Sequence, residues 1–167
     1  MHFFQCWAKQ TELTAVNRRC IESFRALAEE QDSYEFYEFD AESLSRIQIV
    51  QKSNEIRLLK AQERSDLVYS DCDVLWGERW QPENDNFIYA GEVVDSRDYD
   101  RKYCHFAFYV NNRVDLFVEV QRLFSNEYAK SYGAIAKILT RRVNQFVRPI
   151  PKIAYGHLNL TTPTIFL

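Results

Sequence analysis

Strand-like and helix-like stretches alternate along the first 73 residues, and this order constrains the fold more than any other feature of the sequence. Residues 3–7, 34–39 and 67–70 are short apolar or aromatic runs that are typical of strands. Between them, residues 12–30 and 42–64 place apolar side chains at three- and four-residue steps, which is typical of amphipathic helices. The alternation predicts an α/β fold with a central, mostly parallel sheet flanked by helices.

The second half of the chain predicts a mixed order of elements. We expect strands at 87–94 and 105–110, and helices at about 112–125 and 127–145. Prolines in the tail predict an extended segment there rather than a helix. Because no repeat or low-complexity stretch interrupts the pattern, residues 1–167 are expected to form one small domain.

Glycine is scarce in this chain. It has 4 glycines in 167 residues, where about 12 would be usual. Neither a glycine-rich dinucleotide fingerprint nor a P-loop is present. A bound phosphate therefore has to be held by side chains, a metal ion or a helix end.

The charges are segregated along the chain, although the net charge is only −3. Residues 28–45 hold seven acids and no base, and residues 137–152 hold five bases and no acid. Each run is predicted to be a solvated face, and the basic run alternatively attracts a diphosphate or an anionic acceptor. The small net charge gives no general attraction to nucleic acid, so we expect no nucleic-acid partner.

The four cysteines, at positions 6, 20, 72 and 104, are far apart and form no C-x-x-C pair. This spacing argues against a zinc site or a disulfide scaffold and predicts reduced thiols in a cytoplasmic protein. The first residues lack the basic leader and apolar core of a signal peptide. No apolar run approaches the ~20 residues that span a bilayer, so no membrane span is expected.

Asp71-Cys72-Asp73 is the segment most informative about chemistry, because it directly follows the predicted strand at 67–70. Strand side chains alternate between faces, so the two carboxylates are expected to point the same way. Ligands of open α/β sheets bind at the carboxyl ends of strands. Hard divalent ions such as Mg²⁺ and Mn²⁺ prefer oxygen ligands. The tripeptide therefore suggests a metal site, with a chance match or a helix cap as the alternative.

Residues 53–73 resemble the core motif of D-x-D glycosyltransferases, which use sugar nucleotides. They are most similar to the family of the clostridial glucosylating toxins and the yeast initiation-type mannosyltransferases. In that motif an acid and, three residues later, an arginine lie on a Leu-rich helix, followed by paired glycines, a strand and Asp-x-Asp. Here Asn54 stands in place of the acid, Arg57 is the arginine, and Asp66-Leu67 replaces the glycines. The resemblance implies a GT-A-like fold and a metal-dependent, retaining glycosyltransferase.

The resemblance also implies how a nucleotide-sugar donor, a UDP-sugar, is bound. Trp7 would stack on the base, Asn54 would contact the ribose or the sugar, and Arg57 would contact the donor sugar or its phosphate. Each residue has a structural alternative. Trp7 would instead be a half-buried core anchor, and Arg57 would form a surface ion pair with Glu63 or Asp66.

The implied metal, Mn²⁺ or Mg²⁺, would be held by residues from two parts of the chain. Asp71 would contact the ribose, the donor sugar and the metal, and Asp73 would bind the metal directly. His157 would be a late metal or diphosphate ligand, or alternatively a loop histidine with no such role. The implied partners are the sugar nucleotide and a carbohydrate or other hydroxyl acceptor.

Two further functional classes remain open from the sequence. The short length, the missing acid and the missing glycines favour a degenerate, non-catalytic module that only binds a nucleotide sugar. A different metal-dependent phosphoester enzyme would need more acids beside Asp71 and Asp73, for which the sequence offers Glu92, Asp95 and Asp98.

Overall fold

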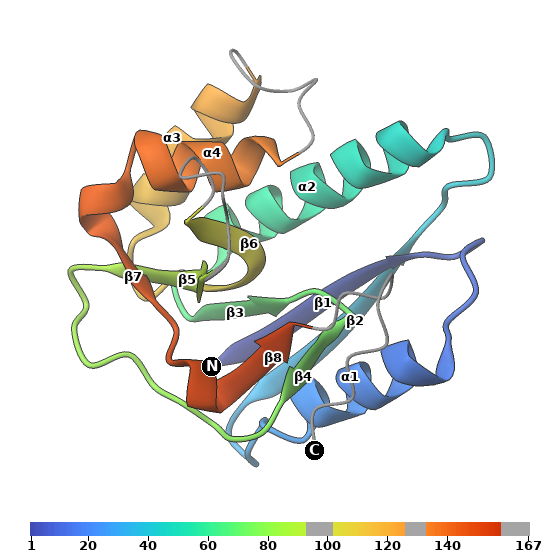
Figure 1. The fold of residues 1–167 in the computed structure, drawn as a ribbon, viewed down its shortest axis with the longest axis horizontal. Helices are drawn as coiled ribbons and strands as arrows, with labels where there is room; N and C mark the ends of the chain where they lie inside the picture. Colours follow the sequence, from blue (N-terminus) through green and yellow to red (C-terminus); the bar gives the residue numbers. More distant parts are fainter. Residues whose placement is uncertain (93–101, 126–132, 158–167) are drawn as a thin grey trace.

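A computed structural model describes residues 1–92, 102–125 and 133–157 of the chain. A six-stranded sheet forms its centre, in the order β2-β1-β3-β6-β5-β7 (Figure 1). β1 is parallel to β2 and β3, β7 is parallel to β5, and β6 is antiparallel to both of its neighbours. The strands are β1 (His2–Ala8), β2 (Ser33–Phe39), β3 (Leu67–Ser70), β5 (Ile88–Glu92), β6 (Tyr103–Tyr109) and β7 (Val147–Pro149).

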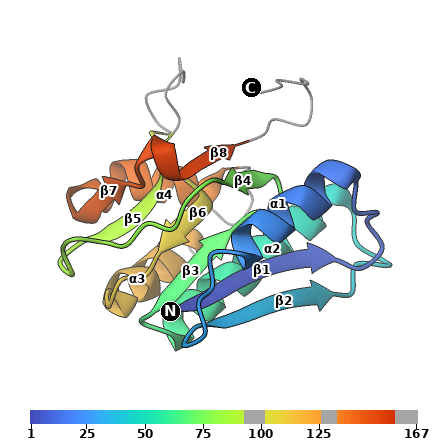
Figure 2. The ribbon, with the colours of Figure 1, turned by 90° about the horizontal axis from the view of Figure 1, so that it is seen from below.

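Helices and a small second sheet cover the two faces of the central sheet. One face carries α2 (Arg46–Glu63), α3 (Val114–Leu123) and α4 (Ala134–Arg141), and Figure 2 shows α1 (Ala15–Arg25) on the opposite face. Beside α1, β4 (Val74–Trp76) pairs antiparallel with β8 (Tyr155–His157). Short 3₁₀ turns at Asn144–Phe146 and Lys152–Ala154 flank β7. The result is a layered α/β fold, as the alternating sequence pattern predicts.

The period of the strands explains the two layers of core. In β1, Phe3 packs with the α1 side and Phe4 with the α2 side, and both rings are fully buried. Val68 and Tyr69 divide in the same way in β3. Strands that are buried on both faces are characteristic of parallel sheets between helices.

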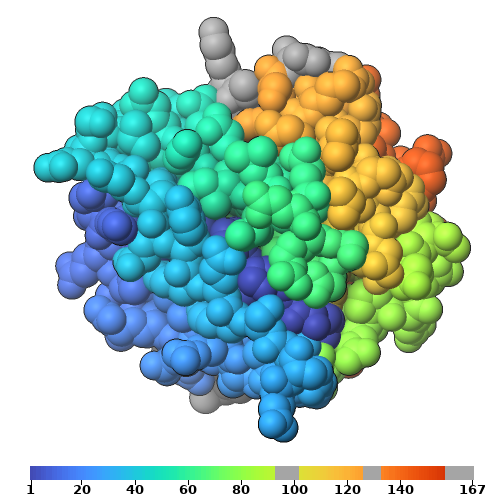
Figure 3. Space-filling view, turned by 180° about the vertical axis from the view of Figure 1, so that it is seen from behind, coloured from blue at the N-terminus to red at the C-terminus, as the bar shows by residue number. Residues whose placement is uncertain are grey.

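Seen from behind, α2 crosses the surface between β2 and α3 (Figure 3).

The helices are shorter than their apolar patterns predict. α1 begins at Ala15 because Thr14 and Asn17 form a reciprocal capping box, with Thr14 Oγ accepting from the Asn17 amide. The helix expected at 127–145 is α4, whose N-cap is Gly133 with a left-handed φ of 74°; residues 126–132 lie outside the described part. β4 and β8 have three residues each, too few to show a period, and the sequence did not predict β4.

The connection from α2 to β3 occurs where the resembled family has paired glycines. Arg64 pairs with Asp66 at 3.0 Å, and Leu67 is fully buried as the first residue of β3. Among described non-glycine residues, a positive φ occurs only at Asn111 and Asn112, which follow β6 in the chain and are not part of this connection. The connection therefore uses ordinary backbone angles, and Asp66-Leu67 imposes no strain on it.

Two further properties of the described residues concern the edge of the sheet and the hydropathy of the helices. β2 is an edge strand, and it carries part of the acidic run together with the exposed Tyr37 ring. Within the described ranges, no helix has both the length and the hydropathy needed to cross a bilayer.

Candidate functional site

A cavity of about 630 Å³ lies at the carboxyl ends of β1 and β3. Its volume is within the range of small-molecule sites, about 300–1,000 Å³. Five residues for which the sequence suggests a role line this cavity together. They are Trp7 near the end of β1, Asn54 and Arg57 on α2, and Asp71 and Asp73 after β3. The fold thus brings residues from three separate segments into one site.

Asp71-Cys72-Asp73 is a turn and not part of a strand. β3 ends at Ser70, and Val74 N donates to Asp71 O at 3.4 Å as the chain enters β4. The prediction that strand alternation aligns the two carboxylates is therefore wrong. Both residues nevertheless line the cavity, because the turn projects its side chains from the sheet edge.

Long-range hydrogen bonds hold this turn in place. Asn17 Nδ2 donates to Cys72 O at 3.0 Å, Gln5 Nε2 donates to Asp71 O at 3.4 Å, and the Asp71 amide donates to Phe106 O at 2.6 Å. Sequence reasoning missed Gln5 and Asn17. Their signal was a polar residue inside an apolar strand or helix stripe, since both are buried and buried polar groups need partners.

Arg57 is buried beneath the turn and connects four parts of the chain. Its Nη2 lies 3.1 Å from Asp71 Oδ1 and donates to Ser53 Oγ at 2.8 Å. Its Nη1 donates to His105 O at 3.2 Å, and its guanidinium carbon lies 4.5 Å from the centre of the Tyr69 ring. Arg57 is therefore placed to fix the orientation of Asp71.

Neighbouring charges and burial each keep one side chain beside Asp71 protonated: the guanidinium of Arg57 and the hydroxyl of Tyr69. Burial alone would lower the pKa of Arg57, but the neighbouring Asp71 and Tyr69 raise it above its ordinary value, so the guanidinium stays charged. Burial raises the pKa of the Tyr69 hydroxyl well above 10, so this hydroxyl stays protonated. It donates a hydrogen bond to Asp71 Oδ1. Asp71 is thus held by a cation and a neutral donor on the same oxygen.

The alternative role for Arg57, an ion pair on the helix surface, is wrong. Asp66 pairs with Arg64 at 3.0 Å, and Glu63 lies 3.5 Å from Lys60. Only 7% of the Arg57 side chain is exposed, so it faces the interior and not the solvent.

Asn54 has a polar atom with no partner among the described residues. Its side chain lines the cavity, the residue is 2% exposed, and no hydrogen bond reaches its Oδ1. An unsatisfied buried acceptor costs about 1–3 kcal/mol. A ligand hydroxyl or amide that donates to this oxygen would remove that cost.

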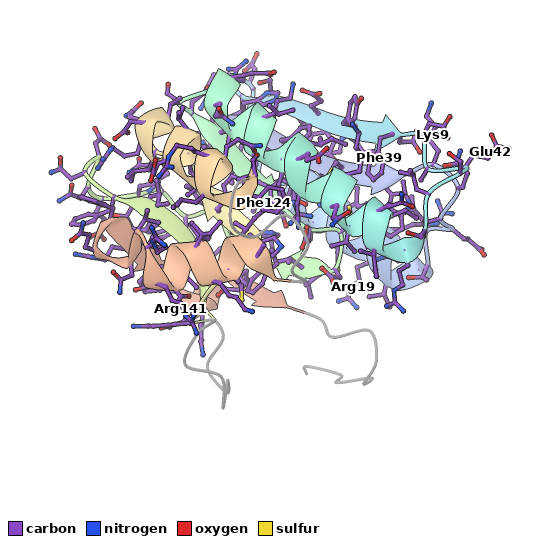
Figure 4. All side chains as sticks on the ribbon, turned by 90° about the horizontal axis from the view of Figure 1, so that it is seen from above. Lys9, Arg19, Phe39, Glu42, Phe124 and Arg141 are labelled. Atoms are coloured by element: carbon purple, nitrogen blue, oxygen red, sulfur yellow. The ribbon has the colours of Figure 1, made fainter. Side chains whose placement is uncertain are left out.

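Trp7 is half-buried and lines the cavity near the end of β1. Its indole N–H donates to Thr11 O at 2.7 Å, which fixes the orientation of the ring. Phe39 lines the same region, and the Lys9 amide donates to Phe39 O at 3.0 Å, where β1 and β2 end (Figure 4). An aromatic wall in fixed orientation is suited to stacking against a planar ring.

The donor set of the cavity fits a hard divalent cation. Asp71 and Asp73 supply carboxylate oxygens, which Mg²⁺ and Mn²⁺ prefer. No group of three His, Cys, Asp or Glu residues suited to a metal occurs within the described ranges, so a ligand such as a diphosphate would have to complete the coordination. In β8, His157 is paired with Val74, the residue after Asp73; its side chain lies outside the described part.

Several other expected residues are not at this cavity. None of the five bases in 137–152 lines it, so the basic run makes no wall of this cavity, and its attraction of a diphosphate or an anionic acceptor stays a prediction. Glu92 also lies outside the lining and is 3.8 Å from Lys102. Asp95 and Asp98 fall outside the described residues.

The cavity also contains residues that sequence reasoning missed. Cys104 and His105 line it from β6, and no local pattern marks them. Cys6 and Cys72 line it as well, and burial raises the pKa of both thiols, so they remain protonated. No disulfide joins the four cysteines.

Comparison with known proteins finds similarity in structure but none in sequence. No protein-family profile matches the chain, and no curated protein matches it in sequence. Its structure is similar to a glycosyltransferase involved in glycosylation of the major capsid of PBCV-1, with a TM-score of 0.63, 9% identity, and 89% of this chain and 81% of that chain covered.

Two further solved structures give similar alignments. The apo form of the glycosyltransferase GlyE of Streptococcus pneumoniae TIGR4 aligns with a TM-score of 0.58 and 10% identity, over 90% of this chain and 44% of that chain. An active-site variant of LgtC aligns with a TM-score of 0.55 and 13% identity, over 89% and 72%. At these identities the likeness concerns the fold, and the chain has the GT-A-like fold of glycosyltransferases.

Proposed function

We propose that this protein is a metal-dependent glycosyltransferase that moves a sugar from a UDP-sugar to a hydroxyl of a carbohydrate or other acceptor. One observation carries the proposal: in a chain with a glycosyltransferase fold, Trp7, Asn54, Arg57, Asp71 and Asp73 line the same cavity. Surface or core residues chosen at random would not converge on one concave site at a sheet edge.

The proposed roles follow from the contacts of each side chain. Trp7 stacks on the nucleotide base, and Asn54 Oδ1 accepts a hydrogen bond from a ribose or sugar hydroxyl, which satisfies a buried acceptor. Arg57 acts as a positioning residue, since its ion pair with Asp71 keeps that carboxylate in one orientation.

Asp71 and Asp73 would hold the divalent cation together with the donor diphosphate, and His157 is a further proposed ligand. When bound, such an ion neutralises the charge that develops on the departing diphosphate. The resemblance on which these roles rest implies retention of configuration at the anomeric carbon. No carboxylate is assigned as a nucleophile, because the lining acids are used for the metal.

The test of this proposal measures UDP release from UDP-glucose, UDP-galactose and UDP-N-acetylglucosamine, with and without Mn²⁺. We expect Mn²⁺-dependent release from at least one donor by the wild type. Asp73→Asn should reduce it about 100-fold or more, because it removes a metal ligand. Asp85→Asn, in an exposed loop outside the cavity, is the matched control. Activity retained in Asp73→Asn would contradict the proposal.

Thermal unfolding separates transfer from binding alone. UDP with Mn²⁺ at about 100 times its Kd should stabilise the wild type by about 2.7 kcal/mol, and UDP without metal should stabilise it much less. A protein that shows this stabilisation but releases no UDP from any donor is a nucleotide-binding module and not a transferase.

A further inference from the structure

One face of α2 forms a continuous wall of the cavity. Its lining residues recur at steps of three and four, as expected for one helix face: Arg46, Ile49, Val50, Ser53, Asn54 and Arg57. At 1.5 Å per residue, the wall extends for about 16 Å along the helix axis. The side chains change in character along this wall. The cation Arg46 is followed by the apolar Ile49 and Val50, and polar side chains follow up to Arg57, which lies beside Asp71.

The two arginines at the ends of this wall differ in their surroundings. Arg57 is buried and ion-paired with Asp71. Arg46 is exposed at the rim of the cavity, and no ion pair or hydrogen bond joins its side chain to another described residue. Arg46 is therefore the lining cation whose donors are available to a ligand.

The stability of α2 does not explain an arginine at this position. Arg46 is the first residue of the helix, and the first turn contains no acid. A cation at a helix N-terminus is opposed by the helix dipole, at a cost of about 0.3–1 kcal/mol. The helix end is already capped by the reciprocal pair Ser45 and Gln48. Recognition of a ligand would explain the positive charge of Arg46, whereas the stability of α2 does not explain it.

We propose that Arg46 reads the edge of the nucleotide base and selects uracil over cytosine and adenine. The inference rests on the proposed function, in which the base stacks on Trp7. Ile49 and Val50 lie on the α2 wall between Arg46 and the polar end, so an apolar ring fits beside them. A guanidinium only donates hydrogen bonds. It matches the carbonyl oxygens of uracil and not the amino group that cytosine or adenine presents at the equivalent edge.

The experiment is calorimetric titration of the full chain with UDP, CDP, ADP and GDP in the presence of Mn²⁺. We expect the wild type to bind UDP about 10-fold more tightly than CDP, a difference typical of one good base contact. Arg46→Met should weaken UDP binding by about the same factor and bring the UDP and CDP affinities within about twofold. Lys52→Met is the matched control, since it removes another exposed cation of α2 outside the cavity.

Each other outcome counts against the proposal in a distinct way. If Arg46→Met weakens all four nucleotides equally, the arginine meets a phosphate and not the base. If the variant keeps the wild-type preference for UDP over CDP and ADP, Arg46 does not select uracil over cytosine and adenine. If the wild type binds none of the four nucleotides, the proposed function fails together with this inference, whereas normal UDP binding by the variant overturns only the inference.

Discussion

Arg57 shows how a single buried side chain can organise a site. Its contacts reach Ser53 on its own helix, Asp71 after β3 and the backbone of His105 in β6. Tyr69 lies beneath the guanidinium and donates to the same Asp71 oxygen. Charge-assisted hydrogen bonds are roughly twice as strong as neutral ones, so Asp71 is more firmly held than an exposed turn residue would be.

At the residue scale, Trp7 gives the sharpest prediction about binding. Trp7→Ala removes the stacking surface, so UDP affinity should fall by about 1–3 kcal/mol in calorimetry. Tyr37→Ala is the control, because it removes an exposed aromatic ring of β2 that does not line the cavity. If both variants bind UDP as the wild type does, Trp7 is a core anchor and not a base platform.

Among the elements, the hairpin of β5 and β6 depends on one of the few glycines. The strand register shifts between Ala90 and Gly91, which marks a bulge. A Cβ on Gly91 would lie 2.3 Å from the Phe106 ring, which is buried and lines the cavity. Glycine is thus required here by a close approach of a side chain to the backbone.

Gly91→Ala is therefore expected to displace Phe106 and to destabilise the fold by about 1–3 kcal/mol, measured by urea denaturation. Phe106 O accepts from the Asp71 amide, so UDP binding should weaken as well. Gly156→Ala is the matched control, because nothing lies within 4 Å of a Cβ there. Equal stability of the two variants would show that Phe106 can move without cost.

At the scale of the whole molecule, a buried ion pair joins the segment after α1 to the loop after β4. Arg79 donates to Asp32, whose side chain is only 1% exposed, and to Leu27 O at 2.8 Å. The hydrogen bond from Arg79 holds the pKa of Asp32 well below its usual range. A depressed carboxyl pKa contributes stability above the pKa of the unfolded chain, about 3.9, and that contribution is lost as the pH falls further.

Arg79→Met should accordingly cost about 2 kcal/mol of unfolding free energy at pH 7, because it removes a charged donor to Asp32, whose other oxygen keeps the Met1 ammonium at 2.6 Å. The difference from the wild type should shrink below about pH 4, where Asp32 becomes protonated in the unfolded chain. Arg122→Met, which removes an exposed pair with Glu119 on α3, should cost less than about 1 kcal/mol. Urea denaturation between pH 3 and 7 measures both, and a pH-independent difference for Arg79→Met would contradict the linkage.

Apolar periodicity along the chain predicted the layered α/β fold and the order of its elements apart from the short strand β4, because this periodicity is a property of each segment alone. The sequence also placed Asn54 and Arg57 on one helix face and Asp71 and Asp73 near a strand end. Which groups meet could be seen in the folded structure alone: Gln5 reaches Asp71 O across 66 residues of chain, and Asn17 reaches Cys72 O across 55. Such partners depend on how strands are ordered in the sheet, and no local pattern encodes that order.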